Sequence, residues 1–457
     1  MATGGAKYAT LVAVAAAAGG FLFGGDTSML NGAITGVATT LDLSPSAVGF
    51  VAAIGLIGSA VGAWFAGPVT AKVGRTRVMG LAGASIAAGS LSASFADGVV
   101  VLGISRVLVG LGIGAASAVV PSYIGEISPT RLRGRLGSMW QFAIVIGQLV
   151  GLLGGFGLTA LAGGEAAPLW PGGAAWRWMF ATVAISAALY VVVARGLPRS
   201  PNDLVRQGHE DRARALLARI GGDPVEQRIA DIREAQSGRM RPATLGDLRG
   251  PLAGLKPVVW TGILLAVLQQ PLGISVVKTY SNTLWQTVGF STETAFVTSI
   301  ITVGVSVLAT VIAISIIDKV PRRTMLGVGA AVSALALGVL AVCFSTAMEG
   351  PDGIEIGGTA GLVALVAMNV FSLAFGITWG PVMWVMLAEL FDDNLRVSAV
   401  AVCTALNWTF NWLVTRTFPL LAGWGLEFAY GAYTVFAVLA LIFVIKVLPE
   451  TRGQELS

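Results

Sequence analysis

Long apolar stretches recur along the whole chain, and they constrain its fold more than any other feature. A helix that crosses the hydrocarbon core of a bilayer needs about 20 predominantly apolar residues. Stretches of this kind fall near residues 8–36, 46–70, 78–97, 100–122, 136–162, 177–195, 254–287, 293–317, 324–346, 358–388, 397–422 and 428–448. Because lipid offers no partner to backbone polar groups, helices are the default way to span it. We therefore predict an all-α membrane protein with about twelve transmembrane helices.

The overall composition agrees with a chain embedded in a membrane. Hydrophobic residues make up 55% of the 457 residues and charged residues only 12%, against about 25% charged residues in soluble proteins. The formal net charge is +5, but no basic run is interleaved with aromatic residues. We attribute the excess to basic cytoplasmic loops and expect no nucleic-acid partner.

Residues that carry enzymatic chemistry are scarce. The two cysteines, Cys343 and Cys403, lie in apolar runs, and the single histidine, His209, lies in a polar segment. The sequence contains no recognisable nucleophile–histidine set, metal-ligand cluster or phosphate-binding loop. We therefore expect neither an enzyme nor a bound metal or cofactor.

A polar, arginine-rich segment divides the apolar stretches into two sets. We expect a six-helix N-terminal half at 1–195, a linker with short amphipathic helices at 196–250, a six-helix C-terminal half at 251–448 and a tail at 449–457. Basic residues gather in alternate loops and in the linker. The positive-inside rule then puts the linker, the tail and both termini in the cytoplasm of a multi-pass cell-membrane protein.

The two halves echo each other in sequence. The segments "KVGRTR" (72–77) and "KVPRRT" (319–324) are offset by 247 residues (319 − 72). Glu126 precedes Arg133 by seven residues, as Glu389 precedes Arg396. This pattern is typical of transporters built from two parallel repeats, which hold their substrate near the midplane and rock around it.

Several motifs, in order along the whole chain, resemble the sugar porter family of the major facilitator superfamily. That family includes bacterial proton–xylose symporters and facilitative glucose transporters. The motifs are "PSYIGEISPTRLRG" (121–134), "QFAIVIGQ" (141–148), "QQPLGI" (269–274), "GPVMWVMLAELF" (380–391) and "PETRG" (449–453). The resemblance implies the major facilitator fold, with two six-helix halves and alternating access.

A neutral sugar or polyol needs uncharged hydrogen-bonding groups and a flat apolar surface, and amides supply both a donor and an acceptor. Gln141 and Gln148 are two helical turns apart, and Gln269 and Gln270 precede a proline and glycine that interrupt their helix. The alternative is that the amides bond helices together and the tryptophans only pack. From residue type and resemblance together, we expect a substrate site formed by Phe23, Gln141, Gln148, Gln269, Gln270, Ser275, Thr279, Gly380, Trp384, Asn407, Trp408 and Asn411.

The chain departs from the family pattern in this site. Ser275 stands where the family has asparagine, Thr279 where it has tyrosine, and Gly25 where a tyrosine is frequent. Each change removes bulk. We therefore predict a pocket that is roomier than one for a plain pentose or hexose.

A carboxylate in the first apolar stretch, Asp26, is costly in a membrane and indicates a function. Burial disfavours its charge and a nearby arginine favours it. Arg106 stands where the resemblance places such a partner. A protonatable pair of this kind predicts proton coupling, and the alternative is a static ion pair.

The charged cytoplasmic motifs predict a gating network. The turn after the second stretch lacks the family's aspartate, because Ala71 stands in its place, and Arg199 replaces a usual glutamate. We therefore expect a weaker cytoplasmic latch in the N-terminal half. The residues expected in the network are Arg75, Glu126, Arg133, Asp318, Arg322, Arg323, Glu389 and Arg396.

Two cations, Lys278 and Arg416, lie toward the outer ends of their apolar stretches. The simpler interpretation is that they reach the outer headgroups or pair with an outer-loop glutamate. The alternative is a cationic outer vestibule that attracts an anionic substrate.

These observations together predict a proton-coupled transporter of a sugar or sugar-like polyol, which we expect to be a monomer in the lipid bilayer. An uncoupled facilitator and a porter of a larger or anionic sugar derivative stay open as alternatives. A nutrient sensor of the same fold is less favoured, since only the short segment "TRGQELS" follows Glu450.

Overall fold

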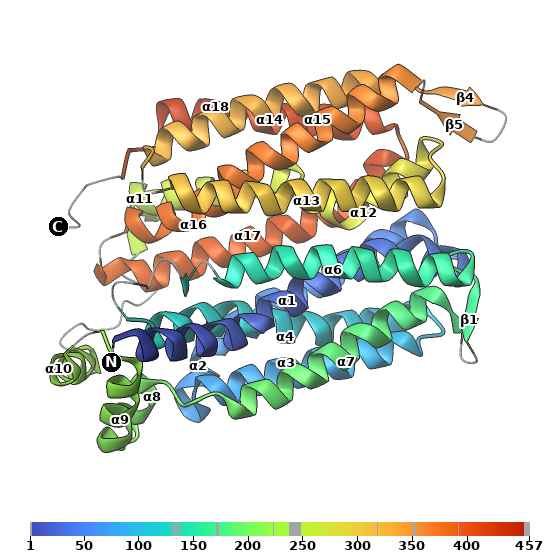
Figure 1. Cartoon of the computed structure of the whole chain (residues 1–457). Helices are drawn as coiled ribbons and strands as arrows, with labels where there is room; N and C mark the ends of the chain where they lie inside the picture. Colours follow the sequence, from blue (N-terminus) through green and yellow to red (C-terminus); the bar gives the residue numbers. More distant parts are fainter. Residues whose placement is uncertain are drawn as a thin grey trace.

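The computed structural model is a bundle of long helices (Figure 1). It describes residues 2–129, 132, 136–137, 139–170, 173–222, 224–236, 248–317, 319–350, 353–356, 358–391 and 393–451. The first half comprises α1 (Ala2–Thr40), α2 (Pro45–Val73), α3 (Arg75–Ser94), α4 (Val99–Ile127), α6 (Met139–Ala162) and α7 (Ala175–Gly196). The short helices α8 (Pro201–Arg206), α9 (Glu210–Ile220) and α10 (Val225–Gln236) follow, as predicted for the linker.

The second half repeats this arrangement, with two of its six spans interrupted. Its elements are α11 (Pro257–Gln269), η3 (Gln270–Leu272), α12 (Ile274–Thr287), α13 (Thr292–Ile316), α14 (Arg322–Ser345), α15 (Gly358–Ile377), α16 (Trp379–Leu390), α17 (Asp393–Ala422) and α18 (Leu426–Lys446). Short strands, which the apolar pattern does not predict, occupy connecting loops: β1 (Pro168–Trp170) with β2 (Gly173–Ala174), β3 (Arg249–Leu252), and β4 (Met348–Gly350) with β5 (Gly353–Glu355).

The bundle has two distinct ends. The start of α1, the end of α18 and α8–α10 lie at one end, which we call the terminal end (Figure 1). The β1 strand and the β4–β5 hairpin lie at the other, which we call the hairpin end. The halves contact each other through α1 with α12, α6 with α13, and α2 with α17.

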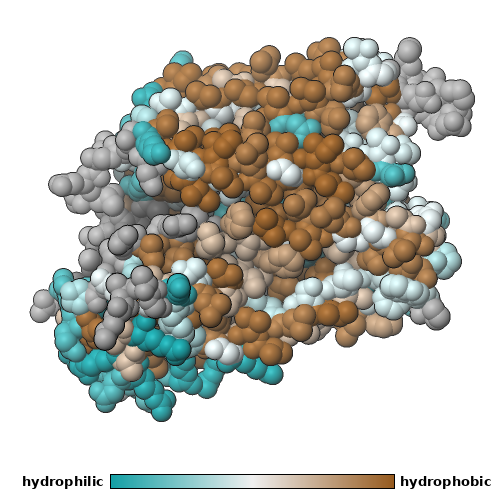
Figure 2. Space-filling view, viewed as in Figure 1, coloured by the Kyte–Doolittle hydropathy of each residue, from teal (hydrophilic) through white to brown (hydrophobic). Residues whose placement is uncertain are grey.

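Apolar side chains cover the sides of the bundle, and polar ones gather at its ends, most clearly around α8–α10 (Figure 2). Within the described residues, ten helices or helix pairs are long and apolar enough to cross a membrane. Two more long helices, α3 and α17, are less apolar because they contain more polar residues, some of which are buried. Ser85 of α3 donates to the main-chain oxygen of Leu108 at 2.7 Å, and Asn407 of α17 is 3% exposed. With these two, the described helices agree with the predicted twelve-helix arrangement.

Glycines bring the helix backbones of the N-terminal half into direct contact. A Cβ atom at Gly110 of α4 would lie 1.9 Å from the main-chain oxygen of Gly55 in α2, and one at Gly58 would lie 2.4 Å from the main-chain oxygen of Val107. Lipid supplies no hydrophobic force between helices, so close packing of small residues has to hold them together. The α2–α4 contact therefore requires glycine at these positions.

Candidate functional site

The span that carries two adjacent glutamines is broken in its middle, where α11 passes through η3 into α12. Pro271 has no backbone N–H, and Gly273 adopts φ +89°, a left-handed conformation that disfavours other residues. A Cβ atom at Gly273 would also lie 2.9 Å from Cδ2 of Tyr433. The break follows the interruption predicted from sequence, and it lets both Gln269 and Gln270 lie buried inside the bundle.

Three side-chain amides meet at this break, and we call Gln269, Gln270 and Asn407 the amide cluster. Gln270 Nε2 donates to Oδ1 of Asn407 at 3.0 Å and to Oε1 of Gln269 at 3.2 Å. Asn407 Nδ2 donates to Oε1 of Gln269 at 2.9 Å. Ser275 Oγ donates to Oε1 of Gln270 at 3.2 Å, and Gln269 Nε2 donates to the main-chain oxygen of Trp379 at 2.9 Å.

The amide cluster joins α11, η3 and α17, so these amides bond helices together in this structure. All three side chains are at most 5% exposed. The same donors and acceptors can exchange their partners for the hydroxyls of a sugar, since an amide offers both kinds of group. The interhelical role and the ligand role are therefore compatible.

A small polar cavity lies between the halves. It is lined by Ser28, Asn31, Gln148, Ile274, Val277, Lys278, Ser281, Ser299, Thr302, Val303, Ser306 and Ser372. The space open to the centre of a water molecule is about 10 Å³, room for roughly one water. Gln148 Oε1 and Ser372 Oγ are buried and have no hydrogen-bond partner within the described part of the chain. We call this space the polar cavity.

The structure separates the two glutamines of α6. Gln148 lines the polar cavity and is 3% exposed, whereas Gln141 lies two turns nearer the terminal end and is exposed. Thr279 is buried, but it is not among the residues that line the cavity. The predicted site residues therefore do not all converge in this conformation.

The aromatic candidates lie around the break at different depths. The rings of Phe23 and Trp408 lie 6.2 Å apart between centroids at 51°, so they connect α1 with α17. Trp384 is 41% exposed, and Gly380 lies just after the interruption between α15 and α16. Asn411 Oδ1 accepts a hydrogen bond from a neighbouring threonine on its own helix. Among the aromatic candidates, Phe23 and Trp408 form a pair that spans the two halves.

Asp26 and Arg106 form a two-pronged ion pair between α1 and α4. Arg106 Nη1 and Nη2 donate to the two carboxylate oxygens of Asp26 at 2.7 and 2.8 Å. The residues are 1% and 5% exposed. Removing one partner from such a pair leaves an uncompensated buried charge, so each residue depends on the other.

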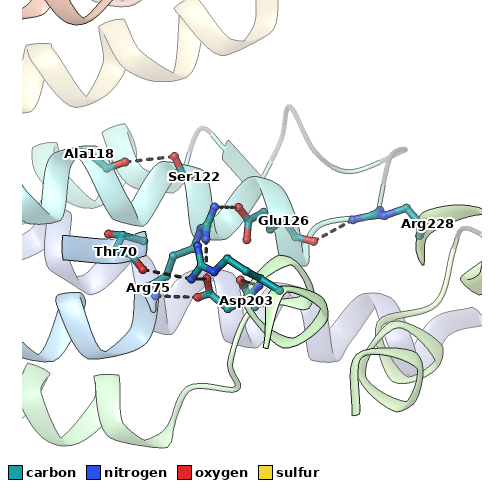
Figure 3. A network of polar contacts seen from close by, with 9 residues as sticks. Thr70, Arg75, Ala118, Ser122, Glu126, Asp203 and Arg228 are labelled. Carbon is teal, nitrogen blue, oxygen red and sulfur yellow. Dashed lines mark hydrogen bonds and ion pairs between the residues drawn. The ribbon is translucent and has the colours of Figure 1, made fainter. Parts of the chain in front are cut away.

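A charge network surrounds Arg75 at the terminal end (Figure 3). The guanidinium of Arg75 contacts the carboxylate of Glu126 and donates to Oδ1 of Asp203 at 3.0 Å. The backbone N–H of Arg75 donates to Oδ2 of Asp203 at 2.8 Å, and Arg206 Nη2 donates to Oδ1 of Asp203 at 2.7 Å. Arg228 Nη2 donates to the main-chain oxygen of Glu126 at 2.9 Å.

Asp203 is a residue of this network that the motif analysis misses. It supplies a carboxylate to the α2–α3 turn, where the family's aspartate is replaced by Ala71. It also lies four residues after Arg199, which replaces the family's usual glutamate and instead donates to Gln207. The acid in "SPND" just inside α8, after a serine N-cap, is the sequence signal that points to it.

The second half has an equivalent network. Glu450 accepts from the backbone N–H groups of Arg322 and Arg323 at 3.0 Å each. Arg322 Nη2 donates to Glu389 at 3.1 Å, and Thr451 Oγ1 donates to the same carboxylate at 2.6 Å. The predicted members Arg133 and Asp318, and the side chain of Arg396, lie outside the described residues.

The two cations predicted near the outer side have different surroundings. Lys278 lines the polar cavity between the halves. Arg416 Nη2 donates to Ser46 Oγ at 3.0 Å and thereby joins α17 to the start of α2. The structure therefore brings Lys278, but not Arg416, together with Gln148.

Hydrogen bonds between described residues join the two halves toward the hairpin end. They are formed by Asn31 with Ser281 and with the backbone of Asn282, Thr35 with Thr283, Gln286 with Glu165, and Arg416 with Ser46. Glu165 lies in the loop after α6 and is 6% exposed. Burial raises the pKa of its carboxyl to about 7, against the lowering effect of hydrogen bonds from Gln286, Thr35 and the backbone of Gly36.

Comparison with known proteins places this geometry in a family. The family model described as "Sugar (and other) transporter" matches residues 12–457. The chain is 39% identical over 457 residues to the "Glucose transport protein" of Synechocystis sp. The alignment covers 100% of this chain and 97% of that protein. It is 31% identical over 486 residues to the "D-xylose-proton symporter" of Escherichia coli K12, and that alignment covers 99% of this chain and 95% of the symporter.

Solved structures agree with these sequence matches. The partially occluded inward-open structure of the xylose transporter XylE from E. coli matches with a TM-score of 0.82 at 29% identity, over 97% of this chain and 100% of that one. XylE bound to 6-bromo-6-deoxy-D-glucose matches with a TM-score of 0.80 at 31% identity, over 98% of each chain. The chain therefore belongs to the sugar transporter family and has the major facilitator fold.

Proposed function

We propose that the protein transports a sugar or sugar-like polyol by alternating access, together with a proton. The observation that carries the proposal is the amide cluster at the broken α11–η3–α12 span, beside a polar cavity between two helical halves. Relatives named as glucose and D-xylose-proton transporters support the substrate class. The family is one of transporters, not enzymes.

The rocking units in this proposal are residues 1–195 and 251–448, connected by the linker at 196–250. The terminal end faces the cytoplasm of the cell membrane, and each monomer works alone. The hydrogen bonds that join the halves toward the hairpin end close the outer side. In the opposite state these hydrogen bonds break, the terminal end closes, and the site opens to the outside. The ion pairs of Arg75 with Glu126 and of Arg322 with Glu389 help to keep the terminal end closed.

The substrate site in this proposal comprises the amide cluster, Gln148 and the Phe23–Trp408 pair, which supply polar groups and a flat apolar surface. Gln141, Ser275, Thr279, Gly380, Trp384 and Asn411 complete it in another conformation of the halves. The small side chains at Ser275 and Thr279 leave room for a substrate larger than a plain pentose or hexose.

Asp26 is the proton carrier of this proposal. With a proton on Asp26, Arg106 loses its ionic partner, and the α1–α4 contact that both residues share is weakened. A change of this kind biases one arrangement of the halves over the other. Sugar uptake then follows the proton gradient.

The test is uptake of radiolabelled D-glucose and D-xylose into proteoliposomes, with and without an inward proton gradient. We expect the wild type to accumulate sugar only with the gradient. Asp26→Asn should exchange sugar between internal and external pools without accumulating it. Asp97→Asn is the matched control, because the Asp97 side chain is 91% exposed at the hairpin-end turn between α3 and α4.

Two outcomes would count against parts of this proposal. Equal uptake with and without the gradient identifies an uncoupled facilitator. No movement of any neutral sugar in a wider panel removes the proposed function itself.

A further inference from the structure

We propose that Lys278 and the polar cavity form a subsite for the carboxylate of an anionic substrate, a sugar acid. The inference rests on the proposed transport function and deepens it, because it names a substrate class for the same site. This subsite differs from the cationic outer vestibule considered from the sequence, because Lys278 lies between the two halves rather than at the outer opening of the transport path.

Lys278 belongs to the face of α12 that lines the polar cavity. Ile274, Lys278 and Ser281 recur there at a spacing of four and three residues, which places them on one side of a helix. Facing them are Ser28 and Asn31 of α1 and residues of α13. Lys278 is partly exposed, and its side chain lines a space that residues of both halves surround.

No carboxylate lines the polar cavity among the residues that the structure describes. The same part of the chain offers Lys278 no hydrogen bond or ion pair. The nearest acid along α1, Asp26, is committed to Arg106 through both of its carboxylate oxygens. An ammonium group held at membrane depth without a counter-charge is costly. An anionic ligand relieves that cost, whereas a neutral ligand does not.

The other groups of the cavity fit a carboxylate. Serine and threonine hydroxyls rotate to donate or accept, and they come from four helices: α1, α12, α13 and α15. Ser372 Oγ is an unused donor in a residue 1% exposed. Gln148, 3% exposed, has an amide oxygen without a partner and can rotate to present its NH₂ group. One lysine supplies a single positive charge, which matches a carboxylate better than a phosphate dianion.

The α12 helix links the subsite to the amide cluster along the chain. Ser275, which donates to Gln270, lies three residues before Lys278 on α12, so the two residues share a helix face. Amides at one end and a cation at the other would orient a sugar with its hydroxyls toward the cluster and its oxidised carbon toward Lys278.

The experiment compares D-glucuronate with D-glucuronamide and D-glucose in proteoliposomes of the full chain. The first two differ in one substituent on the same ring, an anionic carboxylate against a neutral carboxamide of similar shape that replaces one oxygen by an NH₂ donor. We expect glucuronate to be transported and to compete for the site with an inhibition constant roughly tenfold to a hundredfold below that of glucuronamide, the range of one charge-assisted hydrogen-bonding contact. This comparison needs only the wild type, so it does not depend on whether a variant folds.

Lys278→Gln tests the residue, with Lys278→Arg as the charge-preserving variant and Lys446→Gln as the control for charge loss at an exposed site. We expect Lys278→Gln to abolish the preference for glucuronate over glucuronamide and to retain glucose binding. Lys278→Arg should keep most of the preference, and Lys446→Gln should keep all of it.

Failure of this inference can be told from failure of the proposed function. Transport of D-glucose with no preference for glucuronate over glucuronamide overturns the carboxylate subsite and leaves sugar transport standing. Stronger competition by D-glucose 6-phosphate than by glucuronate also overturns it. A preference that Lys278→Gln leaves intact removes Lys278 from the site.

Discussion

The carboxylate of Asp203 accepts a hydrogen bond from the backbone N–H of Arg75 at 2.8 Å, across 128 residues of sequence. Glu450 does the same for the backbone of Arg322, again across 128 residues. The two pairs are related by an offset of 247 residues (450 − 203 and 322 − 75), the same offset that relates the two basic turns. The repeat seen in sequence is therefore also a repeat of contacts.

Replacing Asp203 should destabilise the terminal end of the N-terminal half. Asp203→Asn removes the charge that balances Arg75 and Arg206 in a side chain that is 2% exposed. We expect a loss of about 1–3 kcal/mol and a lower unfolding temperature in detergent. The control is Asp211→Asn, whose side chain is fully exposed at 102%. Equal unfolding temperatures for the two variants would contradict the assigned role of Asp203.

The Asp203 contact also shows what the motif pattern could and could not predict. A comparison with the family's turn motif reveals a missing acid at Ala71 and leads to the expectation of a weaker latch. It cannot reveal a carboxylate supplied by another element, because that contact depends on how α8 folds back under α3. The weaker latch stays a prediction, now for a network with Asp203 in it.

The candidate site also has parts that the sequence could predict and parts that it could not. The conformational preferences of Pro271 and Gly273 predict the break in the helix and the burial of the amides beside it. Side-chain direction on α6 and α12 depends on how the halves pack, so the spacing of Gln141 and Gln148 could not tell which of them reaches the cavity. For the same reason, the sequence left open whether Lys278 points to headgroups or to the interior.

Disrupting the amide cluster should weaken substrate binding. Gln270→Leu removes hydrogen bonds to Gln269, Asn407 and Ser275, each worth about 0.5–1.5 kcal/mol net. We expect KM for the transported sugar to rise roughly tenfold or more. Thr409→Val, at an exposed site two residues after Asn407, is the control.

A second readout separates ligand binding from helix packing in that variant. The unfolding temperature of Gln270→Leu should be measured in detergent with and without sugar. An unchanged KM combined with a lower unfolding temperature would mean that the cluster only holds helices together.

The close contact between α2 and α4 predicts that alanine is tolerated at some glycines and not at others. In Gly110→Ala the new Cβ would lie 1.9 Å from the main-chain oxygen of Gly55, so the helices must separate. We expect little folded protein by size-exclusion chromatography. Gly80→Ala on α3, where nothing lies within 4 Å of the added Cβ, should fold normally and gain up to about 1 kcal/mol in helix propensity. Similar behaviour of both variants would contradict the packing argument.

The contact of Glu165 with Gln286 should make closure of the hairpin end depend on pH. Burial raises the pKa of Glu165 to about 7 in the closed arrangement, and opening to water returns it toward its usual value of 4.5. Between these values the closed arrangement binds a proton that the open one releases. The added stability of closure is therefore fully present below about pH 4.5 and is lost as pH rises through about 7, a difference of roughly 3 kcal/mol.

The measurement is the distance between labels on cysteines introduced at Asp42 and Thr287, two exposed residues at the hairpin end of the two halves. Between pH 5 and pH 8 we expect the wild type to shift from short to long distances. Glu165→Gln cannot ionise, keeps the hydrogen-bonding shape, and should stay closed over this range. The difference between the two proteins isolates the contribution of Glu165 from that of every other group. If both respond to pH alike, Glu165 does not control the closure.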